Sequence, residues 1–154
     1  MPVLSRLLLA CTAFVSVGGC GGTVATPVAV DRVQSLWSAR SPDVGDNSRV
    51  VALVNEVGVA RAGSYSIALR TMKAPYRLVI TLKAPDKPFA DTEFGVPETL
   101  LLGLIGNLDE VVISSGSMSD TLTARAASTN LGYDVKRLGQ DKGALATYLD
   151  DSND

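Results

Sequence analysis

Histidine is absent from this 154-residue chain, and its two cysteines, Cys11 and Cys20, both lie within the first twenty residues. Metal sites built on imidazole or thiolate, Ser/His/Asp triads and Cys/His pairs are therefore excluded from the rest of the chain. The Ser-x-x-Lys motif, which supports nucleophilic chemistry without histidine, is also missing. We therefore expect no catalytic residues, no metal and no cofactor, and a protein that binds rather than catalyses.

Charged residues are scarce, and neither sign dominates. They make up 19% of the chain, with 14 basic and 16 acidic side chains and a formal net charge of −2. This balance leaves no basic surface large enough for nucleic acid, which is therefore not an expected partner. Hydrophobic residues reach 46%, too many for a disordered tail, so the length and composition predict one packed domain.

The first nineteen residues have the pattern of an export signal. Arg6 and the amino terminus precede an apolar run over residues 7–17, which is too short to cross about 30 Å of hydrocarbon as a helix. Residues 17–20, Val-Gly-Gly-Cys, have the form of a lipobox. We therefore expect a signal peptide over residues 1–19 and a diacylglycerol on Cys20. The lipid would hold the protein on the extracytoplasmic face of the cell membrane.

Other interpretations of this leader stay open. The residues that end at Cys11 have the same local form, but only four residues separate Cys11 from Arg6, so no apolar run would remain. Cleavage after Ala25 would give an ordinary secreted protein, and an uncleaved leader would be a membrane anchor. Only the pattern that ends in cysteine accounts for a cysteine at position 20.

The mature chain divides into three parts. Residues 21–35 are small, contain proline and show no helical or strand period, so residues 20–36 are expected to be the lipidated cysteine and a flexible tether. The apolar periodicity that begins near Trp37 predicts a single domain over residues 37–150, and residues 151–154 form an acidic tail.

Hydrophobic spacing predicts a helix followed by a hairpin. Asp46, Asn47 and Ser48 offer helix caps, and apolar residues follow at helical spacing until Gly58 ends the helix. Residues 65–69 and 76–82 alternate between apolar and polar side chains, which indicates two half-buried strands. Their connection is short enough for an antiparallel turn.

The second half of the sequence predicts three helices and one more strand. A helix begins near Pro97, with a buried face formed by Leu100, Leu101, Leu104, Ile105 and Leu108. A short strand covers residues 111–113. Thr123 and Asp141 are expected to cap two further helices, the first ended by Gly132. The predicted fold is α+β, with a small antiparallel three-stranded sheet packed against helices in the order α-β-β-α-β-α-α.

The strongest candidate site is a polar loop before the first predicted helix. Two carboxylates, an amide and a hydroxyl converge there and could bind a hard cation or a peptide amine. Helix capping around a glycine turn needs the same residue types, so that interpretation stays open beside the functional one. The candidate binding residues are Asp43, Gly45, Asp46, Asn47 and Ser48.

Two other polar segments favour structural interpretations. Residues 114–119 could hold an anion on backbone amides, but they lack the glycines and the lysine of a phosphate loop and are typical of a polar turn. Asp109 and Glu110 are expected to be a solvated pair whose side chains point to opposite faces.

Several segments together resemble a known family. Residues 43–48, Asp-Val-Gly-Asp-Asn-Ser, are similar to the signature that opens the domain of unknown function 4825, found in bacterial extracytoplasmic proteins. Four further segments, at residues 67–71, 74–76, 102–110 and 123–134, follow in the family's order. The likeness covers roughly residues 36–150. It implies an extracytoplasmic placement, because members occur as small lipoproteins and as outer parts of membrane-bound sensors.

The expected function is therefore that of a membrane-anchored, non-catalytic binding or interaction domain, with the membrane and a protein of the cell envelope as partners. One alternative is an accessory ectodomain of an envelope-sensing or anti-sigma type signalling system, which would need an exposed apolar patch. Another is a carboxylate-dependent hydrolase, which would need a pocket holding two acidic residues with perturbed pKa values.

Overall fold

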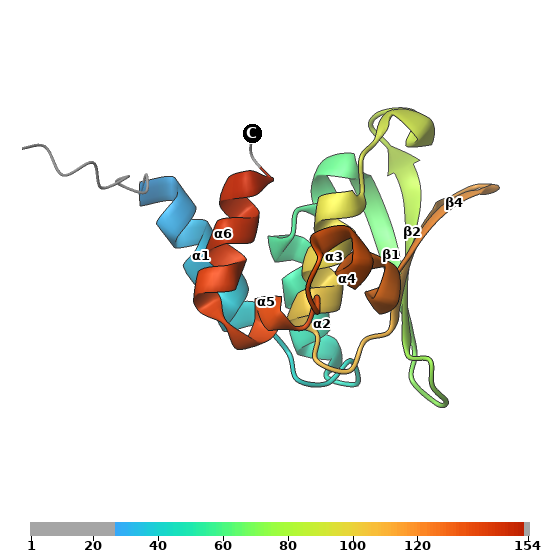
Figure 1. Ribbon diagram of the computed structural model, residues 1–154. Coiled ribbons are helices and arrows are strands. Elements are labelled where there is room, and N and C mark those ends of the chain that lie inside the picture. Colours follow the sequence, from blue (N-terminus) through green and yellow to red (C-terminus); the bar gives the residue numbers. More distant parts are fainter. Residues whose placement is uncertain (1–26, 153–154) are drawn as a thin grey trace, which may run out of the picture.

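The computed structural model describes residues 27–152, and its helices lie on one side of a four-stranded sheet (Figure 1). The first half of the chain contains α1 (Pro27–Ala39), α2 (Asn47–Glu56), the short 3-10 helix η1 (Val59–Ala62), β1 (Gly63–Arg70) and β2 (Arg77–Pro85). The second half contains η2 (Phe89–Asp91), α3 (Gly95–Leu104), β3 (Glu110–Ser115), β4 (Met118–Thr123), α4 (Ala124–Leu131), α5 (Arg137–Gln140) and α6 (Lys142–Asp151).

The sheet corrects the predicted fold class. The domain is α+β, but the prediction of a three-stranded antiparallel sheet was wrong, because four strands lie in the order β1-β2-β3-β4 and β2 pairs with β3 in parallel. The expected β1–β2 hairpin is antiparallel. Helix α3 lies between β2 and β3 in the sequence, and a strand that returns through a helix runs parallel to the strand before it.

Strand β4 was missed because its side chains are almost all exposed. Only Leu122 of this strand is half-buried, so no apolar alternation marks it. The pairing of Ser115 with Met118 leaves Gly116 and Ser117 as a two-residue turn, and Gly116 has a φ of 59°. Such a glycine is typical of tight hairpins, so the segment predicted as a polar turn does contain a turn, and what the prediction lacked is the outer strand of the hairpin.

Helix α3 is the centre of the core. Every residue from Glu98 to Leu104 is buried, and the helix packs against the sheet through β3 and β4. The alternation predicted for the hairpin places Leu78, Ile80 and Leu82 of β2 in the same core, as the spacing had indicated. In the part of the chain that the structure describes, no helix covers the other face of the sheet (Figure 1).

The carbonyl groups near the end of α3 are satisfied by a half-buried lysine. The Lys136 Nζ atom donates hydrogen bonds to the backbone oxygens of Leu102, Ile105 and Leu108, at 2.7, 2.9 and 2.6 Å. All three ammonium hydrogens therefore have a carbonyl partner. This arrangement links the α4–α5 connection to the end of α3.

The predicted helix caps are confirmed. The Asp46, Thr123 and Asp141 side chains each accept a hydrogen bond from a backbone N–H in the first turn of α2, α4 and α6. Gly132 ends α4 with a left-handed φ of 75°. These positions were predictable because a cap depends on residues close in sequence.

The amino-terminal part of the described chain is helical. Helix α1 overlaps the end of the segment expected to be a tether, and its Val33 and Leu36 are buried in the core. The expected signal peptide, Cys20 and the first part of the tether lie outside the described residues. Among residues 27–152, no helix has both the length and the hydropathy needed to span a bilayer.

Candidate functional site

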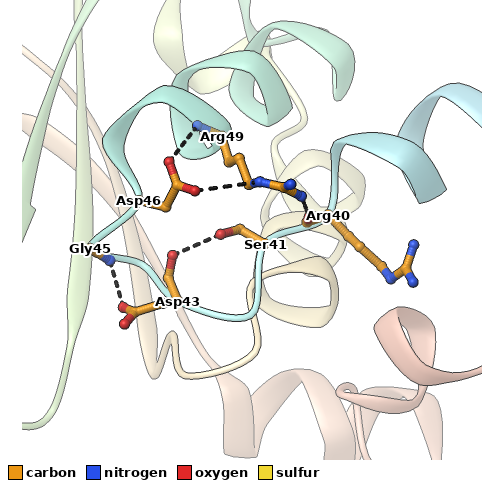
Figure 2. A network of polar contacts seen from close by, with 6 residues as sticks. All are labelled: Arg40, Ser41, Asp43, Gly45, Asp46 and Arg49. Carbon is orange, nitrogen blue, oxygen red and sulfur yellow. Dashed lines mark hydrogen bonds and ion pairs between the residues drawn. The ribbon is translucent and has the colours of Figure 1, made fainter.

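The polar side chains of the predicted loop are bonded to neighbouring groups of the protein (Figure 2). The Asp43 Oδ1 atom accepts hydrogen bonds from Gly45 N at 2.7 Å and from Asn107 Nδ2 at 3.0 Å. These two donors hold the pKa of the Asp43 carboxyl below its usual range. Asn107 in turn accepts from Val44 N at 2.7 Å, so Asp43 serves to fix the loop against the segment after α3.

The second carboxylate of the loop is also occupied. Asp46 caps α2 through Arg49 N and forms an ion pair with Arg49 Nε at 3.4 Å. The Arg49 guanidinium also donates to the Arg40 carbonyl (Figure 2). Asn47 and Ser48 are exposed at the start of α2. No group of three carboxylate, thiol or imidazole residues in the described part of the chain could hold a metal ion, and the geometry favours capping here.

The other polar segments also serve the fold. Residues 114–119 form the turn of the β3–β4 hairpin and the strand residues on either side of it. Asp109 accepts a hydrogen bond from Tyr76 N at 2.7 Å, while Glu110 pairs with Arg77 Nη2 at 2.7 Å. The pair therefore connects β3 to the start of β2 rather than standing alone in solvent.

Sequence reasoning missed Glu98, the most unusual ionisable residue of the described chain. Its side chain lies in the first turn of α3, and the residue is only 2% exposed. Its Oε1 atom is buried without a hydrogen-bond partner in the described structure. A buried polar atom is nearly always paired, so an unpaired carboxyl oxygen needs an explanation.

Burial also changes the ionisation of this group. Loss of solvent raises the pKa of the Glu98 carboxyl to about 8, and the negative charge of Asp120 adds to the shift. At neutral pH the group is therefore mostly protonated, because burial disfavours the charged form. A carboxylic acid that is neutral at pH 7 is a common feature of functional sites.

Glu98 lines an open pocket of about 720 Å³, which we call the acidic pocket. Its walls come from the start of α3, from β4, from α4 and from α6. Its acidic side chains are Glu93, Glu98 and Asp120, and no lysine or arginine among the described residues lines it. Neutral polar and apolar side chains complete the wall, namely Thr92, Thr99, Asn130, Phe94, Val96, Leu122, Leu131 and Tyr148.

Two other pockets lack this combination. One, of about 360 Å³, has charges of both signs, including Arg61, Lys87 and Asp91. The other, of about 430 Å³, is lined by Arg40, Arg49 and Lys136, but all three have partners within the protein. Neither holds a buried side-chain oxygen or nitrogen without a hydrogen bond. The acidic pocket is therefore the best candidate site.

One signal in the sequence could have identified Glu98. The predicted helix buries Leu101, Ile105 and Leu108 on one face. Glu98 lies three residues before Leu101 and seven before Ile105, so helical spacing places it on that same face. A carboxyl within an apolar face predicts a buried acid. Asp120 carried no such signal, because only strand β4 brings it to the pocket.

The fold and the site define a two-layer α+β domain with an acidic pocket at the start of its central helix. A domain-of-unknown-function family, DUF4825, matches residues 36–127, and the chain belongs to this family. The match includes Glu93, Glu98 and Asp120. No curated protein matches the sequence, and no solved structure does either.

Proposed function

We propose that this protein is a membrane-anchored extracytoplasmic lipoprotein whose domain binds a ligand in the acidic pocket. The observation that carries the binding function is Glu98, a buried carboxyl with an unpaired oxygen that lines an open pocket. Leaving a buried polar atom unpaired costs stability. A ligand that supplies the missing partner offsets this cost.

The membrane location is supported by the leader sequence. Residues 17–20 have the form of a lipobox, and Cys20 is the residue that would carry the lipid. A thioether-linked diacylglycerol with a third acyl chain supplies the multiple chains needed for stable anchoring. Expression of the full chain with labelled palmitate tests this location. We expect label in the wild-type protein and none in Cys20→Ser, which should also leave the membrane fraction.

The binding function is tested with a fragment screen by NMR on the full chain. The fragments should include cationic, neutral and anionic molecules, so that the test assumes no charge. We expect at least one class to shift the backbone signals of Thr99, Asp120 and Tyr148, which come from three walls of the acidic pocket. If no fragment of any charge shifts these signals, the binding function is wrong.

A second candidate function is hydrolysis that depends on carboxyl groups. The same pocket favours it, because a protonated Glu98 can donate a proton while a second carboxylate, Asp120, can accept one. It ranks second because residues 27–152 contain no histidine, no cysteine and no Ser-x-x-Lys motif to supply an activated nucleophile. Turnover of a glycoside or peptide substrate that Glu98→Gln abolishes would reverse this ranking.

Docking to a membrane sensor has less support. The large hydrophobic side chains that are exposed in the described part of the chain are Val51, Met72 and Met118. They belong to α2, to the β1–β2 turn and to β4. No shared surface element joins them, whereas a docking face requires a contiguous apolar patch.

A further inference from the structure

The acidic pocket has a charge pattern that selects one class of ligand. Three carboxyl groups line it, and residues 27–152 contribute no lysine or arginine to the lining that would neutralise them. Anions would be repelled by this arrangement, whereas cations would be attracted. The buried oxygen of Glu98 adds a hydrogen-bond acceptor that no protein group satisfies.

The pocket is unsuited to a bare metal ion. Cations such as Ca²⁺ require six to eight oxygen ligands at short distances. Within residues 27–152, no three carboxylates lie close enough together to form such a group. The acidic residues instead come from separate parts of the wall, with Glu93 before α3, Glu98 within it and Asp120 on β4.

The apolar part of the wall suits an organic ligand. Phe94 and Tyr148 provide aromatic side chains, and Leu122 and Leu131 provide aliphatic ones. Aromatic faces attract organic cations, and apolar walls bury the carbon skeleton of a small molecule. Asn130 and the threonines provide further polar groups that can fix the orientation of a ligand.

We infer that the ligand of the acidic pocket is a small organic cation, whose ammonium or guanidinium group pairs with Glu98 while its carbon skeleton packs against the apolar wall. This inference rests on the proposed binding function and names its ligand class. The Glu98 side chain lines the pocket, and its carboxyl group has an oxygen without a hydrogen-bond partner in the described structure, so the ion pair would satisfy a group that the protein leaves unpaired. A charged hydrogen bond of this kind is among the stronger ones available to a protein.

Binding of a cation is linked to release of a proton. Because the pKa of Glu98 is raised to about 8, the free protein holds a proton that the cation must displace. The other ionisable groups that line the pocket are Glu93, Asp120 and Tyr148, and none of them carries positive charge. Affinity should therefore rise roughly tenfold per pH unit between pH 6 and pH 7.5 and level off above pH 8.

Calorimetry on the full chain in detergent tests the inference. The probe is 1,5-diaminopentane, and 1,5-pentanediol, glutarate and Ca²⁺ are the neutral, anionic and metal comparisons. We expect the diamine to bind with proton release, and the diol, glutarate and Ca²⁺ to bind at least roughly tenfold more weakly. Glu98→Gln should lose affinity at least roughly tenfold and lose the pH dependence.

The matched control is Glu56→Gln, which exchanges an exposed glutamate on α2 and should leave the affinity unchanged. Circular dichroism shows whether each variant is folded, and Asp120→Asn, on the exposed strand β4, provides a second variant that should weaken binding. Equal binding of the diol, tighter binding of Ca²⁺ or full affinity in Glu98→Gln would overturn the inference. If only neutral or anionic fragments bind, the ligand class is wrong but the binding function stands.

Discussion

Gly139 of α5 lies directly against the backbone of Gly103 in α3. A Cβ atom built on Gly139 would be 2.6 Å from the Gly103 carbonyl oxygen, which is closer than real side chains approach a backbone atom. Gly103 is packed as tightly, because a Cβ atom there would lie 2.8 Å from the Leu138 Cβ atom of α5 and 2.8 Å from the Val135 carbonyl oxygen. Glycine at both positions therefore lets α5 pack on the central helix.

Gly139→Ala should destabilise the domain by about 1–3 kcal/mol, because the added methyl group must displace backbone atoms. Gly95→Ala is the matched control, since nothing lies within 4 Å of its would-be Cβ atom. Urea denaturation followed by circular dichroism measures both variants. An unchanged midpoint for Gly139→Ala would show that the α3–α5 contact can relax at little cost.

Lys136→Met should destabilise the domain by about 3 kcal/mol, because three carbonyl groups near the end of α3 lose a charged donor. Methionine keeps a similar length and apolar stem, so the loss reports the ammonium group. Lys83→Met, at an exposed position of β2, is expected to change stability by less than about 0.5 kcal/mol. Equal stability of the two variants would contradict the role of Lys136.

Glu98→Gln should change how stability depends on pH. In the folded state the pKa of Glu98 is raised to about 8 from its ordinary value of 4.5, so between about pH 5 and pH 8 the folded protein holds a proton that the unfolded chain has lost. The contribution of Glu98 to stability therefore falls as pH rises, by up to about 1.4 kcal/mol per pH unit. Glutamine does not titrate, so the Glu98→Gln variant should not lose stability in this way as pH rises.

The measurement is the difference in unfolding free energy between Glu98→Gln and the wild-type protein at several pH values. We expect the variant to gain stability relative to the wild-type protein from pH 5 to pH 8, and the difference to level off above pH 8. Parallel curves for the two proteins would show that the Glu98 carboxyl ionises as an ordinary exposed acid does.

Asn107→Ala should loosen the loop before α2 without affecting ligand binding. The variant removes the acceptor for Val44 N and one donor to Asp43, and a loss of about 1–2 kcal/mol in stability is expected. It should also move the pKa of Asp43 up toward its usual range, but only in part, because Gly45 N still donates to the carboxylate. NMR titration of the Asp43 side chain measures this change.

Asn47→Ala serves as the control for that experiment, because Asn47 lies at the exposed start of α2. Both variants should bind 1,5-diaminopentane as the wild-type protein does. A large loss of affinity in Asn107→Ala, with the fold intact, would show that the loop takes part in binding after all.

The parts of the fold that were predictable depend on neighbours in sequence. Alternation predicted the β1–β2 hairpin and its buried face, and single residues such as Asp46, Thr123 and Gly132 predicted helix ends. The parallel pairing of β2 with β3 was missed, although the helix between them is typical of that arrangement. Strand β4 was missed because five of its six residues are exposed and so give no apolar alternation.

The candidate sites likewise combine features that neighbours in sequence predict with features that they do not. The loop at residues 43–48 was visible in the sequence because its polar residues are adjacent, yet in the structure Asp43 fixes the loop and Asp46 caps α2. Glu98 had a signal in its helical spacing. Its proximity to Asp120 gave no signal in the sequence, because 22 positions separate the two residues and only the β3–β4 hairpin brings them together.

By itself the sequence predicted an export signal and a lipidation site, and it determined the absence of histidine chemistry, the helix caps and the apolar faces of the hairpin and of α3. These features follow from residue type and short-range spacing, which act before the chain folds. Only the tertiary structure decided that the sheet is mixed, that Glu98 loses its solvent and that the three carboxyl groups share one pocket. Burial and the interaction of distant charges exist only once separate elements have packed together.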